Sequence, residues 1–334
     1  MKRYGNLFEE VVSFENLVVA AKRAFRGKKD KARVAQFYFD MENELLRIRE
    51  ELLNKTYKPQ PLRIFRIREP KLREIGASDF RDRVVHHAVC NIIEPILERG
   101  YVHHSYACRT GKGTHRAVRQ AQIFSRKNRY YLKCDIRHYF GSIDRNILKE
   151  IIVRKIKDPD LIWLLNIIID SAQSDQRGKG IPIGSLTSQH FANLYLDQLD
   201  HYIKDSLRVK SYLRYMDDFI LFGAEKADLH SLHISIRNFL HDELELELKD
   251  KATTLAPVQD GIPFLGFRIF PNLIRLKQEN KKRAFNTLKS RTRAFKAGKI
   301  SEAEYSQSLM SITEHLKIAN TYNLRKDVFD KMFF

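Results

Sequence analysis

The feature that most constrains the fold is a pair of apolar segments joined by two acidic residues. Residues 212–216 (YLRYM) and 219–222 (FILF) flank Asp217 and Asp218. Apolar runs separated by two polar residues predict a β-hairpin with the two aspartates at its tip. Successive strand residues point to opposite faces, so both carboxylates reach forward together only at a tight turn. The pattern therefore predicts a hairpin that presents two carboxylates at one end.

A third carboxylate follows another apolar segment upstream. Residues 130–136 (YYLKCDI) indicate a buried strand that ends at Asp135. Neighbouring carboxylates repel and raise each other's pKa unless a cation lies between them. Mg²⁺ typically takes one or two protein carboxylates plus substrate phosphates, and two such ions ~4 Å apart stabilise both the attacking and the leaving oxygen of an in-line displacement. A lone Asp-Asp pair is usually a surface turn, but the flanking strands and Asp135 favour a metal site.

The overall charge indicates a polyanionic partner. The chain has 60 Lys and Arg residues against 41 Asp and Glu, a net charge of +19, which fits nucleic acid or an anionic membrane surface. Its longest apolar run, residues 161–169, falls short of the ~18 residues that a spanning helix needs. Glu9 and Glu10 stand where a signal peptide needs an apolar core. We therefore expect a cytoplasmic protein with no membrane association.

The hydrophobic pattern predicts alternating helical and strand regions. The expected helices are residues 6–53, 79–97, 147–169, 191–203 and 232–246, and the expected strands and turns are residues 59–76 and 262–270. The three cysteines are odd in number and scattered, which predicts neither a disulfide framework nor a zinc site.

The segment of residues 275–299 combines positive charge with an apolar stripe. It holds ten basic residues against one acidic residue, and Phe285, Leu288 and Phe295 recur at helical spacing. This pattern predicts a basic amphipathic helix. A calmodulin-type or membrane-surface helix is the alternative, but the charge of the whole chain favours a helix lying on a nucleic-acid backbone.

Several motifs together resemble reverse transcriptases. Tyr215-Met216-Asp217-Asp218 matches their YxDD box, and four further segments occur in family order across about residues 60–270. They are similar to the fingers–palm motif at 105–117 (SYACRTGKGTHRA), the palm motif with the first catalytic Asp at 133–144 (KCDIRHYFGSID), the motif under template and nucleotide at 180–200 (GIPIGSLTSQHFANLYLDQLD), and the primer grip at 264–266 (FLG).

The resemblance implies a right-hand polymerase of the α/β class. Its parts would be a helical N-terminal region over 1–58, fingers and a palm of antiparallel sheet plus helices over 59–270, and a small, basic helical thumb over 271–334. The implied reaction is RNA-templated DNA synthesis from dNTPs on a template RNA with a primer or cDNA strand. Two Mg²⁺ ions, with Mn²⁺ as a possible substitute, would be held by Asp135, Asp217, Asp218 and the backbone carbonyl of Ile136, the three aspartates being catalytic.

The resemblance also assigns residues around the incoming nucleotide. Phe140, five residues beyond Asp135, matches an aromatic steric gate against the ribose 2′-hydroxyl, although outside this motif it would be a core Phe. Gly184 would let the backbone approach the nucleotide closely. Lys71 and Arg73 match basic finger residues that grip the triphosphate, and Ile183 and Gln189 belong to the nucleotide-floor motif. Arg109 would brace the fingers or contact the nucleotide. Lys251 would be a proton donor to pyrophosphate.

In the expected thumb, the nucleic-acid-binding residues are Lys281, Lys282, Arg283, Arg291 and Arg293.

Two departures in the nucleotide-floor motif narrow the family. Ile183 stands where most retroviral and group II intron enzymes carry Gln, and Gln189 stands where they carry Pro. Together with the YMDD box, this form resembles the reverse transcriptases of diversity-generating retroelements. Those enzymes copy a template-repeat RNA with errors at adenines and work with a small basic accessory variability protein.

Two alternatives remain open. One is another stand-alone bacterial reverse transcriptase, such as an antiphage defence type. The other is an RNA-binding scaffold with a degenerate polymerase fold, which the intact Asp135, Asp217 and Asp218 disfavour.

Overall fold

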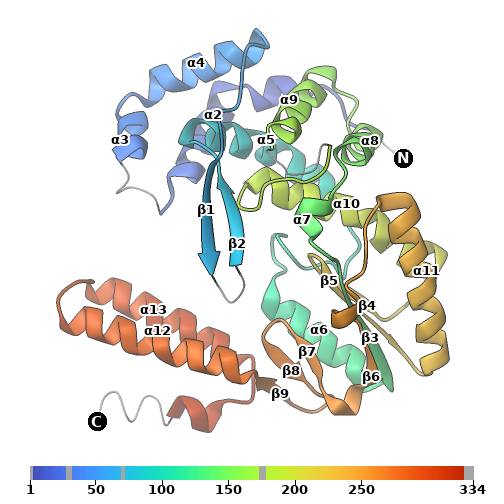
Figure 1. Cartoon of the computed structure of the whole chain (residues 1–334). Helices are drawn as coiled ribbons and strands as arrows, with labels where there is room; N and C mark the ends of the chain where they lie inside the picture. The colour runs from blue at the N-terminus through green and yellow to red at the C-terminus, as the bar shows by residue number, and fades with distance from the viewer. Residues whose placement is uncertain (1–2, 28–31, 69–71, 173–177, 327–334) are drawn as a thin grey trace. The chain divides into compact units, whose positions relative to one another are not determined.

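The chain packs as two units, each built from several segments. The computed structural model describes residues 3–27, 32–68, 72–172 and 178–326 (Figure 1). The first unit comprises Met1–His103, Ile136–Arg208 and Ser235–Lys249, and the second comprises His104–Asp135, Val209–Ile234 and Asp250–Phe334. These units cut across the boundaries at 58 and 270 expected from the sequence. The division into N-terminal region, fingers with palm, and thumb therefore stays a prediction about roles.

The first unit is mainly helical. Its central helix is α5 (Phe80–Glu98), which packs against α2 (Phe14–Phe25) and α10 (Leu186–His201). Asp79 caps α5 by accepting a hydrogen bond from the Arg81 backbone N–H. The other elements of this unit are α1 (Phe8–Val11), α2 (Phe14–Phe25), α3 (Ala32–Phe39), α4 (Met41–Leu53), the antiparallel hairpin of β1 (Arg63–Arg68) and β2 (Leu72–Ala77), α7 (Tyr139–Ser142), α8 (Arg145–Lys155), α9 (Pro159–Asp170), α10 (Leu186–His201) and the π-helical turn Tyr202–Ser206.

The expected single helix over 147–169 is wrong, because two helices occupy this region. α8 ends at Lys155 and α9 begins at Pro159. Proline lacks the N–H that a helix interior requires but is tolerated in the first turn, so Asp158-Pro159 starts a new helix. Asp158 caps that helix by accepting hydrogen bonds from the Asp160 and Leu161 N–H groups at 3.1 Å each.

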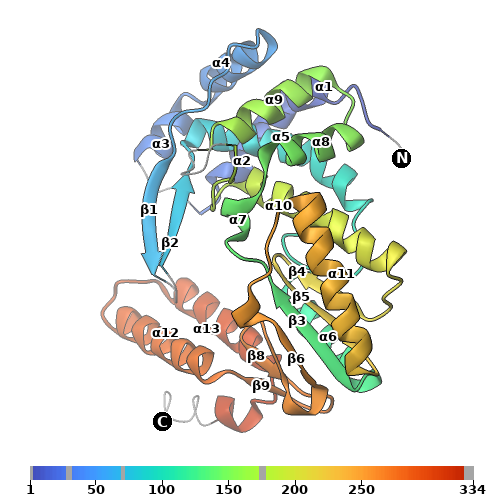
Figure 2. The same cartoon turned by 45° about the vertical axis from the view of Figure 1, so that its right-hand side comes forward.

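The second unit is built on a four-stranded antiparallel sheet. Its strand order is β4-β5-β3-β6, from β4 (Tyr212–Tyr215), β5 (Asp218–Gly223), β3 (Tyr130–Asp135) and β6 (Thr254–Pro257). Figure 2 shows these strands side by side. The remaining elements are α6 (Thr114–Lys127), α11 (Lys226–Leu244), which runs on into the first unit, the 3-10 turns Asp250–Ala252 and Val258–Asp260, the three-stranded sheet β7-β8-β9 (Ile262–Phe264, Phe267–Ile269, Ile274–Leu276), α12 (Gln278–Lys296) and α13 (Glu302–Lys317).

One face of the four-stranded sheet forms the core of the second unit. Tyr131, Ile220, Phe222 and Leu213 share this face and are buried. They belong to one apolar cluster with side chains from α6 and the β7-β8-β9 sheet. The other buried members of this cluster are Tyr106, Ala117, Val118, Ala121, Phe124, Val258, Ile262, Phe264, Phe267, Ile269, Ile274 and Ala319. The alternation of side chains along the strands therefore determines which residues reach this core.

The C-terminal segment follows the expected pattern with one correction. Residues 275 and 276 end strand β9, so the basic helix begins only at Gln278. α12 and α13 lie side by side, with the rings of Phe295 and Tyr305 stacked at 4.7 Å between centroids. Ser301 and Glu304 form a reciprocal capping box at the start of α13. The segment predicted as a helical thumb thus contains two packed helices, and its role as a thumb stays a prediction.

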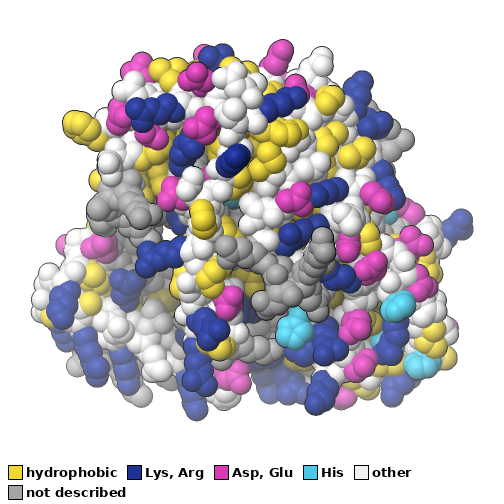
Figure 3. Space-filling model, turned by 45° about the horizontal axis from the view of Figure 1, so that its top comes forward, with side chains coloured by type: hydrophobic (Ala, Val, Ile, Leu, Met, Phe, Trp, Pro, Cys, Tyr) yellow, Lys and Arg dark blue, Asp and Glu magenta, His cyan; other side chains and the backbone are white. Residues whose placement is uncertain are grey.

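The distribution of charge differs between parts of the surface. Over the upper part of the face in Figure 3, Lys and Arg side chains alternate with Asp and Glu, whereas basic side chains predominate at the lower left, over α12 and α13. The three cysteines are free thiols, two buried and one exposed. Among the described helices, none has the length and apolarity to cross a membrane.

The cap at Asp158 predicts an unusually large stability loss on mutation. Its Oδ2 also accepts the N–H groups of Leu7 and Phe8, at 2.6 and 3.0 Å, so one buried carboxylate joins the N-terminal segment to α9. We expect Asp158→Ala to lower the free energy of unfolding by about 2–3 kcal/mol, measured by urea denaturation at pH 7. Asp144, which caps α8 through two N–H groups only, is the matched control, and Asp144→Ala should cost about 1 kcal/mol.

The effect of Asp158 should also depend on pH. Burial opposes its ionisation, but the hydrogen bonds from Phe8, Leu161, Leu7 and Asp160 outweigh this and lower the pKa of the carboxyl. The contribution of a carboxyl with a lowered pKa is present above the unfolded-state pKa of about 3.9 and is lost as the pH falls through the folded-state value. Equal destabilisation by Asp158→Ala and Asp144→Ala at pH 7 would contradict the larger stabilising role predicted for Asp158.

Candidate active site

The register between β3 and β5 brings two of the predicted catalytic aspartates together. Asp135 ends β3 and lies directly opposite Asp218, the first residue of β5. Directly opposed residues in an antiparallel pair share one face of the sheet. The two carboxylates therefore continue, at the strand ends, the same face whose apolar part packs against α6. A prediction from two separate motifs thus converges on one place in the second unit.

The expected position of Asp217 and Asp218 within the hairpin needs a correction. The two-residue turn of the hairpin is Met216-Asp217, because Tyr215 pairs with Asp218. Only Asp217 lies in the turn, and Asp218 is part of the strand. The expectation that both aspartates occupy the tip is wrong, since the antiparallel ladder extends one residue further than apolarity alone indicates.

The turn is held by a buried arginine that the sequence analysis did not single out. Met216 has φ of 57°, in the left-handed region that few non-glycine residues adopt. Arg214 is fully buried in β4, and its Nη1 donates to the Met216 carbonyl at 3.1 Å. The Thr114 hydroxyl donates to the Tyr215 hydroxyl at 3.2 Å. A charged residue inside an otherwise apolar strand was the available signal, because a buried guanidinium requires partners.

A lysine neutralises the strand carboxylate. Lys133 shares its face of β3 with Asp135, and its Nζ lies 2.7 Å from Asp218 Oδ1. Burial raises the pKa of the Asp218 carboxyl to about 6; the Lys133 ammonium opposes this rise, and the carboxylates of Asp135 and Asp217 add to it. The site therefore concentrates negative charge in a half-buried position within a strongly basic protein.

The donor atoms at this site suit a hard divalent cation. Carboxylate oxygens are the ligands that Mg²⁺ prefers, and a cation, the Lys133 ammonium, already lies beside Asp218. Among the residues that the structure describes, however, no three His, Cys, Asp or Glu side chains stand arranged to hold a metal ion. The metal-ligand roles of Asp135, Asp217, Asp218 and the Ile136 carbonyl therefore stay predictions.

The predicted nucleotide floor lies in the first unit and is fixed by backbone contacts. The Gly76 N–H of β2 donates to the Ile183 carbonyl at 2.9 Å. Gly184 has φ of 110°, and a Cβ there would lie 2.8 Å from Ile75 Cγ2. A side chain at this position would have to displace that of Ile75 and would hold φ where L-residues are rarely found. The loop that carries Ile183 and Gly184 is thus held tightly against the β1-β2 hairpin.

The predicted steric gate belongs to the same assembly. The Ile181 N–H donates to the Phe140 carbonyl at 2.9 Å, and the hydroxyl of Tyr139 donates to the Ala192 carbonyl of α10. Phe140 itself is half-buried, with its ring edge-on to Tyr139 at 5.6 Å. These bonds join α7, the floor loop and α10, so Phe140 and Ile183 are positioned by one set of contacts.

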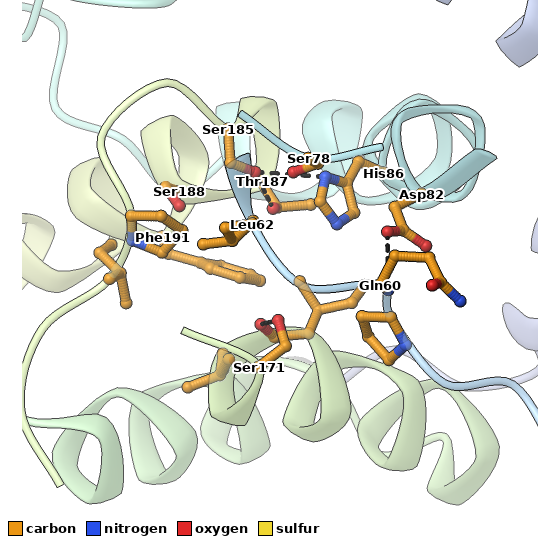
Figure 4. Close-up of a pocket in the computed structure, with 15 residues that line it drawn as sticks. Gln60, Leu62, Ser78, Asp82, His86, Ser171, Ser185, Thr187, Ser188 and Phe191 are labelled. Carbon is orange, nitrogen blue, oxygen red and sulfur yellow. Dashed lines mark hydrogen bonds between the residues drawn. The ribbon is translucent and has the colours of Figure 1, made fainter. Parts of the chain in front are cut away.

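A small cavity lies beneath the floor loop (Figure 4). Its volume is about 10 Å³, enough for roughly one water. His86 is buried in its wall, and its Nδ1 lies 3.2 Å from Ser185 Oγ, which in turn lies 2.8 Å from Thr187 Oγ1. The nearby Ser78 Oγ is buried with no hydrogen-bond partner among the described residues. This polar network supports the first turn of α10, directly after the floor loop.

The remaining predicted site residues occupy varied positions. Lys71 lies outside the described residues. Arg73 is exposed on β2, and Lys251 is exposed in the 3-10 turn after α11. Arg109 donates through Nη1 to the Ser105 carbonyl at 2.8 Å, which braces its own loop. Gln189 is half-buried in α10, and the thumb residues Lys281, Lys282, Arg283, Arg291 and Arg293 all lie on α12. Their binding roles stay predictions.

Comparison with known proteins agrees with this architecture. Residues 58–269 match the family model described as "Reverse transcriptase (RNA-dependent DNA polymerase)". Protein YkfC of Escherichia coli is 27% identical over 270 residues, covering 68% of this chain and 71% of its own length. The group II intron-encoded protein LtrA of Lactococcus lactis is 23% identical over 298 residues, covering 68% of this chain and 50% of LtrA. The chain thus spans about half the length of LtrA.

Solved structures show the same fold. Apo telomerase from Candida tropicalis superposes with a TM-score of 0.53 at 15% identity, over 78% of this chain and 57% of that one. Telomerase from Candida albicans gives 0.52 at 11% identity, over 67% and 48%. The chain therefore belongs to the reverse transcriptase family of RNA-directed DNA polymerases, and the expected right-hand polymerase fold is confirmed.

The buried histidine of the cavity predicts a pH-dependent stability. Burial lowers the pKa of His86 to about 4, and the charges of His87 and Arg83 add to this. Between pH 4 and about 6.5 the unfolded state binds one more proton than the folded state, so stability falls as the pH is lowered through this window. From pH 7 to pH 5 this contribution should decrease the free energy of unfolding by about 2 kcal/mol, measured by urea denaturation.

Two variants test the assignment to His86. His86→Asn retains a hydrogen-bonding group toward Ser185 and should remove this share of the pH dependence. His230→Asn, on the exposed surface of α11, is the matched control. An identical pH dependence in wild type and His86→Asn would show that another group is responsible.

Proposed function

We propose that this reverse transcriptase makes error-prone cDNA from a template-repeat RNA in a diversity-generating retroelement. The observation that carries its catalytic part is the register that sets Asp135 opposite Asp218, with Asp217 in the adjoining turn. In this proposal Asp135, Asp217 and Asp218 are catalytic and bind two divalent ions, Mg²⁺ by preference, with the Ile136 carbonyl as a further ligand. When bound, such ions stabilise the attacking and leaving oxygens of an in-line displacement.

The first unit supplies the proposed nucleotide selection. Phe140 would exclude the ribose 2′-hydroxyl, and its carbonyl contact with Ile181 supports this role because it links the gate to the floor loop. Gly184 is exposed and carries no side chain, so the backbone there would be open to close approach by a nucleotide. Lys71 and Arg73 would grip the triphosphate. From the second unit, Arg109 would brace the fingers or contact the nucleotide, Lys251 would donate a proton to pyrophosphate, and the basic side chains of α12 would follow the nucleic-acid backbone.

The retroelement assignment rests on Ile183 at the nucleotide floor. Its side chain neither donates nor accepts a hydrogen bond, whereas Gln at this position in related enzymes lies beside the incoming nucleotide. A contact made only in correct pairing geometry favours correct over incorrect incorporation, so its loss lowers discrimination. A basic accessory variability protein is the proposed partner. Because the chain itself carries +19, RNA between the two proteins would supply the opposite charge.

Primer extension on an RNA template tests the catalytic assignment. Asp217→Asn should abolish dNTP incorporation, by at least 10³-fold, because it removes an ionised ligand from a turn and no volume from the core. RNA binding by gel shift and the urea unfolding curve should stay near wild type. Asp260→Asn, an exposed aspartate of the same unit, is the control and should retain full activity. Near-normal extension by Asp217→Asn would overturn the assignment.

The error spectrum of the cDNA tests the retroelement assignment. Wild-type cDNA should carry errors chiefly opposite template adenine, and Ile183→Gln should lower their frequency roughly fivefold to tenfold, since one hydrogen bond is worth ~1 kcal/mol. Ile183→Val, which keeps an apolar β-branched side chain, is the control and should retain the wild-type spectrum. A uniform wild-type spectrum would favour another stand-alone reverse transcriptase. Equal spectra in wild type and Ile183→Gln would assign Ile183 to packing.

A further inference from the structure

The ion pair between Lys133 and Asp218 has no role in the function described so far. Lys133 Nζ lies 2.7 Å from Asp218 Oδ1, and the lysine side chain is only 12% exposed. Among the residues that the structure describes, the same buried carboxylate oxygen has no hydrogen-bond partner of regular geometry. Within that part of the chain, its neutralisation therefore depends on the Lys133 ammonium group.

The register explains why a cation is needed at this place. Asp135 and Asp218 are directly opposed across two strands, and like charges in such pairs destabilise a sheet. Half-burial makes an unpaired carboxylate more costly. Lys133 lies on the same face, two pairs further along the ladder, opposite the uncharged Ile220. Its ammonium thus reaches Asp218 diagonally and offsets the repulsion.

The position of the ammonium conflicts with a metal ion on the same oxygen. Mg²⁺ sits about 2.1 Å from its ligand oxygens. An ammonium 2.7 Å from Oδ1 occupies the space in front of that oxygen and repels a divalent cation strongly at such short range. A lysine head group lies on a flexible four-carbon stem and is able to swing away.

We propose that Lys133 is a positioning residue that serves as the internal counter-ion of the metal-free site and leaves Asp218 when a divalent cation binds. The inference rests on the proposed metal-binding role of Asp218. Metal ion and ammonium compete for one oxygen, so Lys133 weakens the first metal-binding step and stabilises the sheet before that step. The catalytic strands are thereby kept in register without metal.

Metal binding to the full chain without nucleic acid tests the competition. The probe is Mn²⁺ alone, titrated into the protein while free Mn²⁺ is measured by electron paramagnetic resonance. Lys133→Met should bind Mn²⁺ about tenfold more tightly than wild type. Metal-free Lys133→Met should also melt at a lower temperature than the wild type, and saturating Mn²⁺ should raise its melting temperature by more than it raises that of the wild type.

Two further variants serve as controls. Lys133→Arg keeps the positive charge and should bind Mn²⁺ no more tightly than wild type. Lys149→Met removes an equally close ion pair, 2.7 Å from Asp170, on the surface of the first unit, and should leave Mn²⁺ affinity unchanged. Should Lys133→Met fail to fold, Lys133→Gln provides the same neutral charge with a polar head group.

The outcomes separate this inference from the proposed function. Unchanged or weaker Mn²⁺ binding by folded Lys133→Met or Lys133→Gln overturns the counter-ion role. A raised KM for dNTP with unchanged Mn²⁺ affinity would assign Lys133 to the nucleotide and also overturn it. If the competition is observed but wild type extends no primer, the counter-ion role stands and the proposed polymerase function fails. If wild type extends primers but no competition occurs, only the inference fails.

Discussion

The pairing of β3 with β5 is the interaction on which the proposed catalytic centre depends. A slip of one residue would exchange the two faces of β3, moving Lys133 and Asp135 to the side now held by the buried Leu132 and Cys134. The apolar part of the ladder, which packs against α6 and the β7-β8-β9 sheet, excludes this slip. The hydrophobic core of the second unit thus determines which carboxylates meet at the strand ends.

Two cations inside the second unit support this arrangement in different ways. Arg214 acts on the backbone, since its guanidinium holds the carbonyl of a left-handed residue in the turn. Lys133 acts on charge, since its ammonium faces a half-buried carboxylate. The net charge of +19 does not replace these contacts, because surface charges are screened by water and salt over about 8–10 Å. Local neutralisation at the strand ends therefore requires cations from within the fold.

The first unit holds its predicted nucleotide-floor loop by a different principle. Backbone hydrogen bonds from Gly76 to Ile183 and from Ile181 to Phe140 fix the path of the chain. The side chain of Ile75 leaves no room for a Cβ at position 184. The buried, neutral His86 contacts the residue that follows this loop, through a hydrogen bond between its Nδ1 and Ser185 Oγ. Because the contact of Ile183 with β2 is made by its backbone carbonyl, a change of side chain at 183 does not remove this hydrogen bond.

The sequence alone determined the class of the protein, the hairpin at 212–222, the strand ending at Asp135 and the family order of the motifs, because apolar alternation and motif spacing are local properties of the chain. It also predicted a basic helix from residue 275, three residues before the observed start at Gln278. Only the tertiary structure decided that Asp218 belongs to the strand and that β3 lies between β5 and β6. It alone revealed the buried partners of Lys133 and Arg214 and the interleaving of the two units. Those features depend on pairing between segments that are distant in the chain. The packing of apolar side chains selects this pairing, and no short stretch of sequence contains the information.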